Sequence, residues 1–154
     1  MRILVSACLI GGLCKYNGKS NSNERVRRYL EGAEIIAVCP EVMGGLPIPR
    51  TPAEIVDGIV TTRDGRDVDA AFRRGAAMAL DLALKKSVDL AILQSRSPSC
   101  GVRQVYDGTF SGKKIKGRGV LAEALVRAGV PVVDEKELLS GRDAEGLTAF
   151  RDQP

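Results

Sequence analysis

Four cysteines are the residues of this 154-residue chain best suited to chemistry, and the chain contains no histidine. They are Cys8, Cys14, Cys39 and Cys100. Without histidine, the chain lacks the commonest general base and the mixed Cys/His ligand sets that often bind zinc. In a chain without an export signal, four cysteines are better explained as ligands or reactive thiols than as a disulfide framework. Any chemistry must therefore use Cys, carboxylates, Ser, Tyr, Lys or a cofactor.

Three of the cysteines hold equivalent positions relative to short apolar runs that we interpret as buried strands. These predicted strands are Ile3–Ser6, Glu34–Val38 and Leu90–Leu93. Cys8 follows the first, Cys39 ends the second, and Cys100 lies in the loop after the third. Because the carboxyl ends of parallel strands share one edge of a sheet, we expect the three thiols to converge there. Each cysteine taken alone could equally be a small buried hydrophobe.

Three thiolates without a histidine partner suit a soft metal centre, and the natural candidate is a [4Fe–4S] cluster with one iron left open. A zinc site with Cys14 as the fourth thiolate is the alternative. The spacing Cys8-x5-Cys14 differs from the closer pairs usual for zinc, which favours the cluster. Cys14 could be a fourth cluster ligand, a sulfur-relay thiol or a structural cysteine, and we leave it out of the ligand set.

The remaining patterns alternate between strands and helices. Helices are predicted at Asn23–Leu30, Val68–Lys86, Gly119–Ala128 and Asp134–Leu139. A strand is predicted at Ile55–Thr62, with a tight turn in the RDGRD that follows it, and a further strand at Val130–Val133. This alternation is typical of an α/β fold. We expect one domain over residues 1–154, with a Rossmann-like, mainly parallel sheet, flanking helices and long cysteine-bearing loops.

Composition narrows the range of partners. The 44% hydrophobic content can supply a core, and the net charge of +4 comes from Lys and Arg mixed with Asp and Glu. We interpret the basic run KKIKGR as a solvated loop, so we expect no nucleic-acid partner. The expected partner is a small-molecule substrate. The N-terminus has neither a cleavage region nor an apolar span, so a cytoplasmic location without membrane association is expected, as a monomer or homodimer.

Several multi-residue blocks carry a family resemblance. They are VSACLIGGLCKYNG, VCPEVMGGLPIPRTPAE, DGRDV and SRSPSCG followed by YDGTFSGKKIKGRGV. In these blocks, from about Ile3 to Val133, the chain resembles a family of small bacterial proteins, long of unknown function, that includes the thiouracil desulfurases. The ordered set of blocks is far more specific than a single cysteine pattern.

The resemblance implies a [4Fe–4S] cluster held by Cys8, Cys39 and Cys100, with the fourth iron free to bind the sulfur of a thiolated small molecule such as 2-thiouracil. Family membership does not fix the substrate. The chain also departs from the usual family pattern beside the site, at Asn17, Ser95 and Val102.

The expected reaction is desulfuration by water. Coordination of a thiocarbonyl sulfur to the open iron would draw electron density from the attached carbon and expose that carbon to attack. Glu41, two residues after Cys39, is our candidate proton acceptor, and its alternative role is to cap a loop or to pair with Arg50. Ser97 is the second candidate catalytic residue, with a hydroxyl that could bind substrate or cluster sulfur, although Ser97 and Ser99 could equally satisfy their own turn. A sulfur transferase and a non-catalytic cluster-binding or redox-sensing protein remain alternative functions.

Further pocket residues are predicted from the polar loops. Tyr16, Asp107 and Thr109 are candidates for pocket walls or substrate contacts, whereas Tyr106 and Phe110 are expected to pack in the core.

Overall fold

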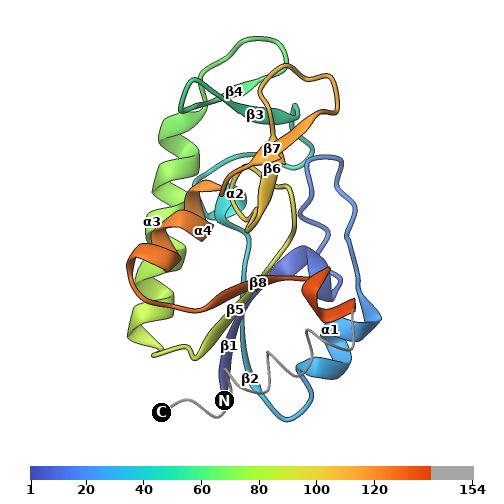
Figure 1. Cartoon of the computed structure of the whole chain (residues 1–154), viewed down its shortest axis with the longest axis vertical. Helices are drawn as coiled ribbons and strands as arrows, with labels where there is room; N and C mark the ends of the chain where they lie inside the picture. The colour runs from blue at the N-terminus through green and yellow to red at the C-terminus, as the bar shows by residue number, and fades with distance from the viewer. Residues whose placement is uncertain (140–154) are drawn as a thin grey trace.

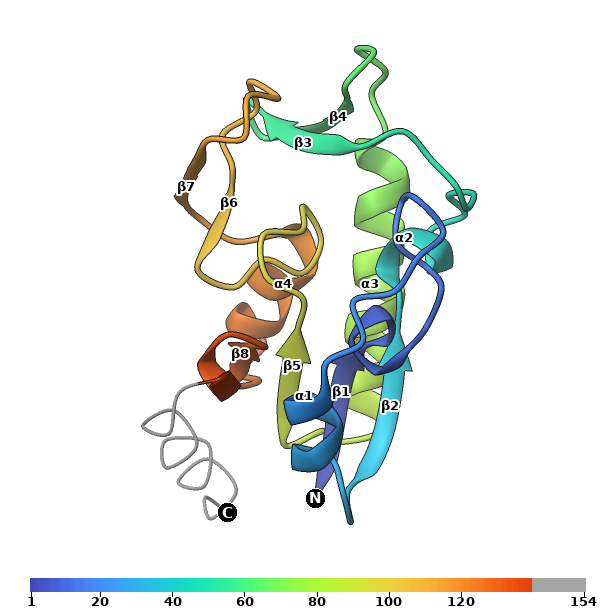
Figure 2. The ribbon, with the colours of Figure 1, turned by 90° about the vertical axis from the view of Figure 1, so that its right-hand side faces the viewer.

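A four-stranded parallel sheet lies at the centre of the computed structural model, which describes residues 1–139 (Figure 1, Figure 2). The strand order is β2-β1-β5-β8, and each neighbouring pair is parallel. The bounds are β1 Arg2–Ser6, β2 Glu34–Val38, β5 Leu90–Leu93 and β8 Val132–Asp134. The predicted Rossmann-like α/β architecture is confirmed, and all four carboxyl ends meet at one edge of the sheet.

Helices cover both faces of this sheet, and the alternation of side chains along the strands explains why. The helices α3 (Asp69–Lys85) and α4 (Val120–Arg127) pack on one face, where the side chain of Leu4 from β1 joins their apolar cluster. Its neighbours Ile3 and Val5 point to the other face and pack with α1 (Glu24–Tyr29). That second face also carries the 3-10 segments η1 (Ala7–Ile10) and η2 (Glu137–Leu139).

The predicted boundaries are close for the long elements and wrong for some short ones. Asn23 caps α1 by accepting a hydrogen bond from the amide of Val26 at 3.1 Å. The strand predicted at Val130–Val133 begins at Val132, and the final predicted helix forms only the 3-10 turn η2. The last part of the predicted domain, 140–154, lies outside the described residues.

The single strand predicted at Ile55–Thr62 is a hairpin, β3 (Ala53–Val56) and β4 (Ile59–Thr62). Its two loop residues, Asp57 and Gly58, have φ values of 50° and 79°. Positive φ at both positions fits the twist of a two-residue hairpin, and Asp-Gly is a preferred pair for it. The dipeptide was therefore the signal that distinguished a hairpin from one longer strand.

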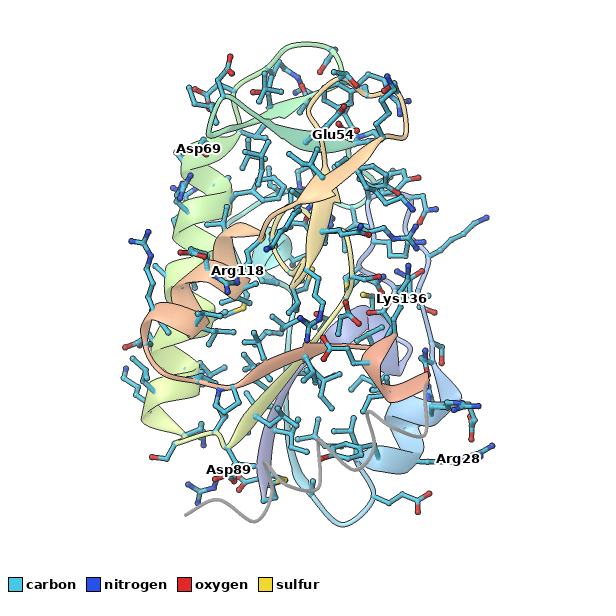
Figure 3. The ribbon with its side chains drawn as sticks, viewed as in Figure 1. Arg28, Glu54, Asp69, Asp89, Arg118 and Lys136 are labelled. Atoms are coloured by element: carbon cyan, nitrogen blue, oxygen red, sulfur yellow. The ribbon has the colours of Figure 1, made fainter. Side chains whose placement is uncertain are left out.

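A second hairpin, β6 (Gln104–Tyr106) with β7 (Lys114–Lys116), forms where only an irregular loop was predicted. Both hairpins lie beyond the carboxyl ends of the sheet (Figure 1). Glu54 of β3, labelled in Figure 3, joins them: its Oε1 accepts hydrogen bonds from the amides of Gly108 at 2.9 Å and Phe110 at 3.2 Å. The two hairpins thus form a roof over the edge where the strands end.

The short helix α2 (Pro40–Met43) begins directly after Cys39 and lies against α3 at backbone contact distance. A Cβ atom added at Gly75 would come within 1.7 Å of the carbonyl oxygen of Pro40, and one at Gly44 within 2.0 Å of that of Ala71. Two glycines therefore let the helices touch, and this contact fixes the direction in which Cys39 leaves the sheet. Among the described residues, no helix has the length and apolar content needed to cross a membrane.

This contact can be tested with the Gly75→Ala variant. In an isolated helix, alanine would be favoured over glycine by about 1 kcal/mol. The clash with the Pro40 carbonyl reverses that sign, and we expect the free energy of unfolding to fall by at least ~2 kcal/mol. Urea denaturation measures it, with Ala77→Gly at an exposed position of the same helix as a control that should cost about 1 kcal/mol. A stabilised Gly75→Ala protein would contradict the close packing.

Candidate functional site

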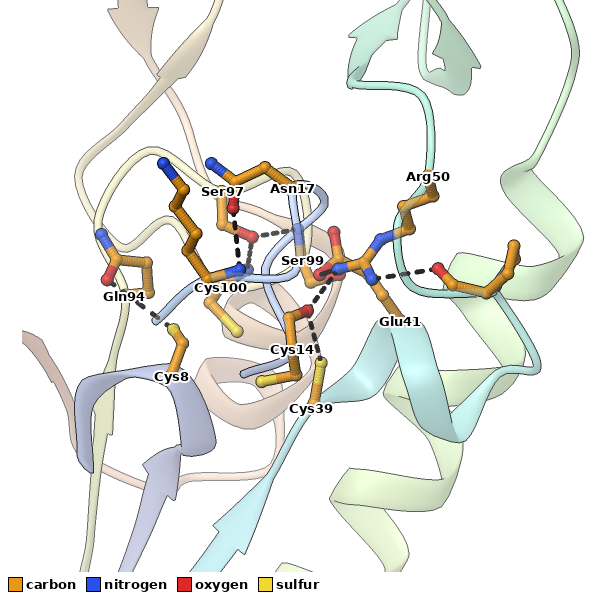
Figure 4. Close-up of polar contacts among 12 residues, drawn as sticks. Cys8, Cys14, Asn17, Cys39, Glu41, Arg50, Gln94, Ser97, Ser99 and Cys100 are labelled. Atoms are coloured by element: carbon orange, nitrogen blue, oxygen red, sulfur yellow. Dashed lines mark hydrogen bonds and ion pairs between the residues drawn. The ribbon is translucent and has the colours of Figure 1, made fainter. Parts of the chain in front are cut away.

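Three cysteines from three different elements line one cavity of about 690 Å³ (Figure 4). Cys8 lies on η1 directly after β1, Cys39 separates β2 from α2, and Cys100 lies in the loop that follows β5. The structure therefore brings these three thiols together at the carboxyl edge of the sheet, as their positions after the strands predicted. Cys14 also lines this cavity.

The turn that carries Cys100 is held by hydrogen bonds from both sides. The Oγ of Ser97 accepts from the amides of Ser99 at 3.1 Å and Cys100 at 3.2 Å, while the carbonyl of Ser99 accepts from the amide of Leu121 in α4 at 2.8 Å. Gly119 permits this contact, because a Cβ there would lie 2.5 Å from the carbonyl carbon of Ser99. The predicted local role of Ser97 is observed, and Ser97 also lines the cavity.

Cys8 is buried between two carboxamides. Its Sγ donates to Oε1 of Gln94 at 3.8 Å, and the side chain of Asn21 forms a hydrogen bond with its sulfur. Burial, together with the nearby Cys39 and Glu41, raises the pKa of Cys8 to about 11, against the lowering effect of Asn21. Cys8 is therefore a neutral thiol at neutral pH when no cation is bound.

Cys39 is the thiol most inclined to ionise. The Cys14 thiol forms a hydrogen bond with its sulfur, which lowers the pKa of Cys39 and raises that of Cys14. A hydrogen bond from the backbone of Val42 also favours the Cys39 thiolate. The pKa of Cys100 is raised, first by burial and also by the charges of Glu41, Cys8 and Cys39, although the hydroxyl of Ser6 opposes this shift.

Glu41 and Arg50 form a buried ion pair at the cavity. The Nη2 of Arg50 donates to Oε2 of Glu41 at 2.9 Å, and the two side chains are 8% and 17% exposed. The same Nη2 donates to the carbonyl of Cys14 at 2.9 Å. Burial raises the pKa of Glu41, and the adjacent guanidinium acts in the opposite direction. The pairing proposed from the sequence is observed, and because Glu41 still lines the cavity, a role as proton acceptor is compatible with it.

The cavity walls differ from the prediction at the roof. Tyr106 and Phe110 line the cavity rather than packing in the core, because the β6–β7 hairpin holds them there. Asp107 and Thr109 are not among the lining residues, and they bond to each other instead at 2.6 Å. Tyr16 lines the cavity as predicted.

Sequence reasoning missed the polar residues that contact the thiols, Ser6, Asn21 and Gln94, and also Glu135, which holds Gln94. Ser6 ends β1 and Gln94 directly follows β5, so the strand-end rule that selected the cysteines could have found both. Asn21 and Glu135 had no such signal, because their contacts with Cys8 and Gln94 depend on the folding of separate loops.

The donor set fits an iron–sulfur cluster. Three thiolates close enough to raise one another's pKa are stable together only beside a strong positive charge, which a metal centre supplies. Within residues 1–139, no three Cys, Asp or Glu side chains are close enough to hold one metal ion. A cluster makes a different demand, because each thiolate binds its own iron and the sulfurs need not approach one another as ligands of a single ion must.

Comparison with known proteins gives consistent results. The family model described as 2-thiouracil desulfurase matches residues 3–137. An uncharacterised protein of Bacillus subtilis (strain 168), YbbK, is 42% identical, and the match covers 88% of this chain and 97% of YbbK. A solved structure described as the [4Fe-4S]-dependent thiouracil desulfidase TudS (DUF523Vcz) is 41% identical with a TM-score of 0.87, over 96% of this chain and 98% of that one.

These matches confirm the resemblance carried by the cysteine-bearing blocks. The matched region includes the sheet, both hairpins and every cysteine. The match therefore spans the fold and the segments that form the cavity, and the chain belongs to the 2-thiouracil desulfurase family.

Proposed function

We propose that this protein is an iron–sulfur-dependent desulfurase that replaces the sulfur of 2-thiouracil, or of a related thiolated small molecule, with oxygen from water. The observation that carries the proposal is the convergence of Cys8, Cys39 and Cys100 on one cavity. The desulfurase family model and the description of the TudS relative as a [4Fe-4S]-dependent thiouracil desulfidase support the same reaction.

The three cysteines would hold a [4Fe–4S] cluster, leaving Cys14 outside the ligand set. When bound through three thiolates, such a cluster supplies an iron without a protein ligand, which can act as a Lewis acid toward a thiocarbonyl sulfur. The overall reaction is a hydrolysis: the carbon–sulfur bond is replaced by a carbon–oxygen bond from water, and sulfide is released without net electron transfer.

Glu41 serves as the proton acceptor for the attacking water in this proposal. Its carboxylate lines the cavity next to the thiols, and Arg50 fixes one of its oxygens at 2.9 Å. The other oxygen is left to face water or substrate. Burial raises the proton affinity of this carboxylate, which makes it a better base than an exposed one.

Ser97 serves as the hydrogen-bond donor. Its oxygen already accepts two backbone amides, so its hydroxyl proton is directed away from them. This arrangement holds one donor in place at the cavity wall, where a polar group of the substrate can accept it.

The ligand assignment is tested by anaerobic reconstitution with iron and sulfide. We expect Cys8→Ala, Cys39→Ala and Cys100→Ala to lose the visible absorbance and most of the bound iron and sulfide, because each removes one of three thiolates. Cys14→Ala is the matched control and should retain the cluster. Retention of a full cluster by any of the first three variants, or loss of the cluster from Cys14→Ala, would contradict the assignment of the three cysteines as ligands.

The proton acceptor is tested with Glu41→Gln, which keeps an oxygen for Arg50 but cannot take a proton. We expect kcat for 2-thiouracil to fall at least ~100-fold at unchanged iron content. Conversion is followed by loss of thiocarbonyl absorbance and by free sulfide, which also separates hydrolysis from sulfur transfer to an acceptor. Glu24→Gln, at an exposed helix position, should behave as the parent. Parent-like turnover by Glu41→Gln would show that another group takes the proton.

The donor role is tested with Ser97→Ala and Ser97→Thr. We expect the alanine variant to lose about tenfold in kcat/KM, because one hydrogen bond to the substrate disappears, and the threonine variant to recover much of it. Iron content is measured in both, since Ser97 also holds the Cys100 turn, and Ser22→Ala at an exposed site is the control. Equal kcat/KM for the alanine variant and the parent would exclude the role.

A further inference from the structure

Gln94 occupies a position in the cavity wall that the proposed reaction does not yet use. It directly follows β5, and its carboxamide lies beside Cys8, with Oε1 3.8 Å from the sulfur (Figure 4). Its backbone amide donates to Oγ of Ser6 at 2.9 Å, so the residue is anchored at the strand end. A rigidly placed amide at this edge of the sheet is suited to recognising a ligand.

A buried carboxylate sets the direction of this amide. Glu135 is 8% exposed, and its Oε1 accepts a hydrogen bond from Nε2 of Gln94 at 3.4 Å. The carbonyl of Ser95 accepts from the same Nε2 at 3.3 Å. Both partners accept hydrogen bonds and neither can donate one, so the NH₂ group of Gln94 must face them. The oxygen of the amide is consequently turned toward Cys8 and the cavity.

Glu135 is itself held in place by Ser95. Its Oε2 accepts from the amide of Ser95 at 2.8 Å, and its Oε1 accepts from the Ser95 hydroxyl. The chain of contacts therefore runs from Ser95 through Glu135 to Gln94, and it leaves one orientation for the carboxamide.

The thiol of Cys8 supplies the hydrogen bond that Oε1 of Gln94 accepts in this structure. A cysteine that binds iron does so as a thiolate and has no proton to donate. With Cys8 as a ligand, the amide oxygen is an acceptor without that donor, fixed at the wall of the substrate cavity. An unmatched acceptor in a part-buried position costs free energy unless a ligand or water supplies a donor.

We propose that Oε1 of Gln94 accepts a hydrogen bond from a ring N–H adjacent to the thiocarbonyl of the substrate. This inference rests on the proposed function and narrows its substrate class to cyclic thioamides and thioureas with an unsubstituted nitrogen beside the C=S carbon. Ser97 supplies a donor and Gln94 an acceptor, which matches the alternation of N–H and carbonyl groups around a thiouracil ring. Glu135 acts as a positioning residue through Gln94.

The test compares 2-thiouracil with 1-methyl-2-thiouracil and 3-methyl-2-thiouracil on the iron-loaded parent and on Gln94→Leu, which keeps a similar volume without the acceptor. In the parent, we expect methylation of the recognised nitrogen to lower kcat/KM by at least ~10-fold. In Gln94→Leu, we expect kcat/KM for 2-thiouracil and for that methylated isomer to differ by no more than about threefold, because the discriminating oxygen is absent. Gln104→Leu, an exposed glutamine on β6, is the matched control and should discriminate as the parent does.

A second readout avoids turnover. Uracil carries the same N–H groups without sulfur, so calorimetric titration with uracil and with 1-methyluracil and 3-methyluracil reports binding alone. The parent should favour uracil over one methylated isomer by at least ~10-fold in Kd, and Gln94→Leu should lose that preference. Glu135→Gln, which can donate to Oε1 and so lets the amide turn, should weaken discrimination at unchanged iron content.

The outcomes separate this inference from the proposed function. A parent that converts 2-thiouracil but does not discriminate against either methylated isomer overturns the role of Gln94 and leaves the desulfurase intact, as does a Gln94→Leu variant that discriminates as the parent does. A parent protein with a full iron content that converts no thiouracil overturns the proposed function. The uracil titrations then still decide whether Gln94 accepts a hydrogen bond from a ring N–H.

Discussion

The guanidinium of Arg50 is the group on which the shape of the cavity depends. It joins helix α2 to the loop that carries Cys14, through the carboxylate of Glu41 on one side and the carbonyl of Cys14 on the other. Its side chain is 8% exposed, so these bonds form in a largely water-free environment. Removing one partner of such a pair leaves a buried charge uncompensated, at a typical cost of about 3–5 kcal/mol. These contacts of Arg50 therefore position Glu41 and hold the Cys14 loop against helix α2.

The electrostatics of the thiols complement this arrangement. Burial and mutual repulsion keep Cys8 and Cys100 protonated, whereas the hydrogen bond from Cys14 favours the thiolate of Cys39. In the proposed ligand set, a metal centre would displace protons from at least two buried thiols as it binds, so its affinity would be coupled to pH.

The sequence was sufficient to predict the sheet and the convergence of the cysteines, because both follow from short-range patterns and one rule of topology. Short apolar runs mark β1, β2 and β5 in the sequence, and parallel pairing brings their carboxyl ends together. The hairpin β6–β7 was not predicted because its strands have only three residues each, which is too short for an alternation of polar and apolar residues to be recognised. The contact between Gln94 and Glu135 could not be predicted either, because those residues are far apart in the sequence and meet only when β8 pairs with β5.

The roof and the floor of the cavity are built by different means. The thiols follow the strands of a parallel sheet that carries an apolar cluster on each face. The roof consists of two short hairpins joined through the carboxylate of Glu54. Changes of side chain or loop length in the hairpins can reshape the entrance without displacing a strand of the sheet. Within one family, the range of molecules admitted can therefore diverge while the reactive centre stays constant, and relatives with the same cysteines need not share a substrate.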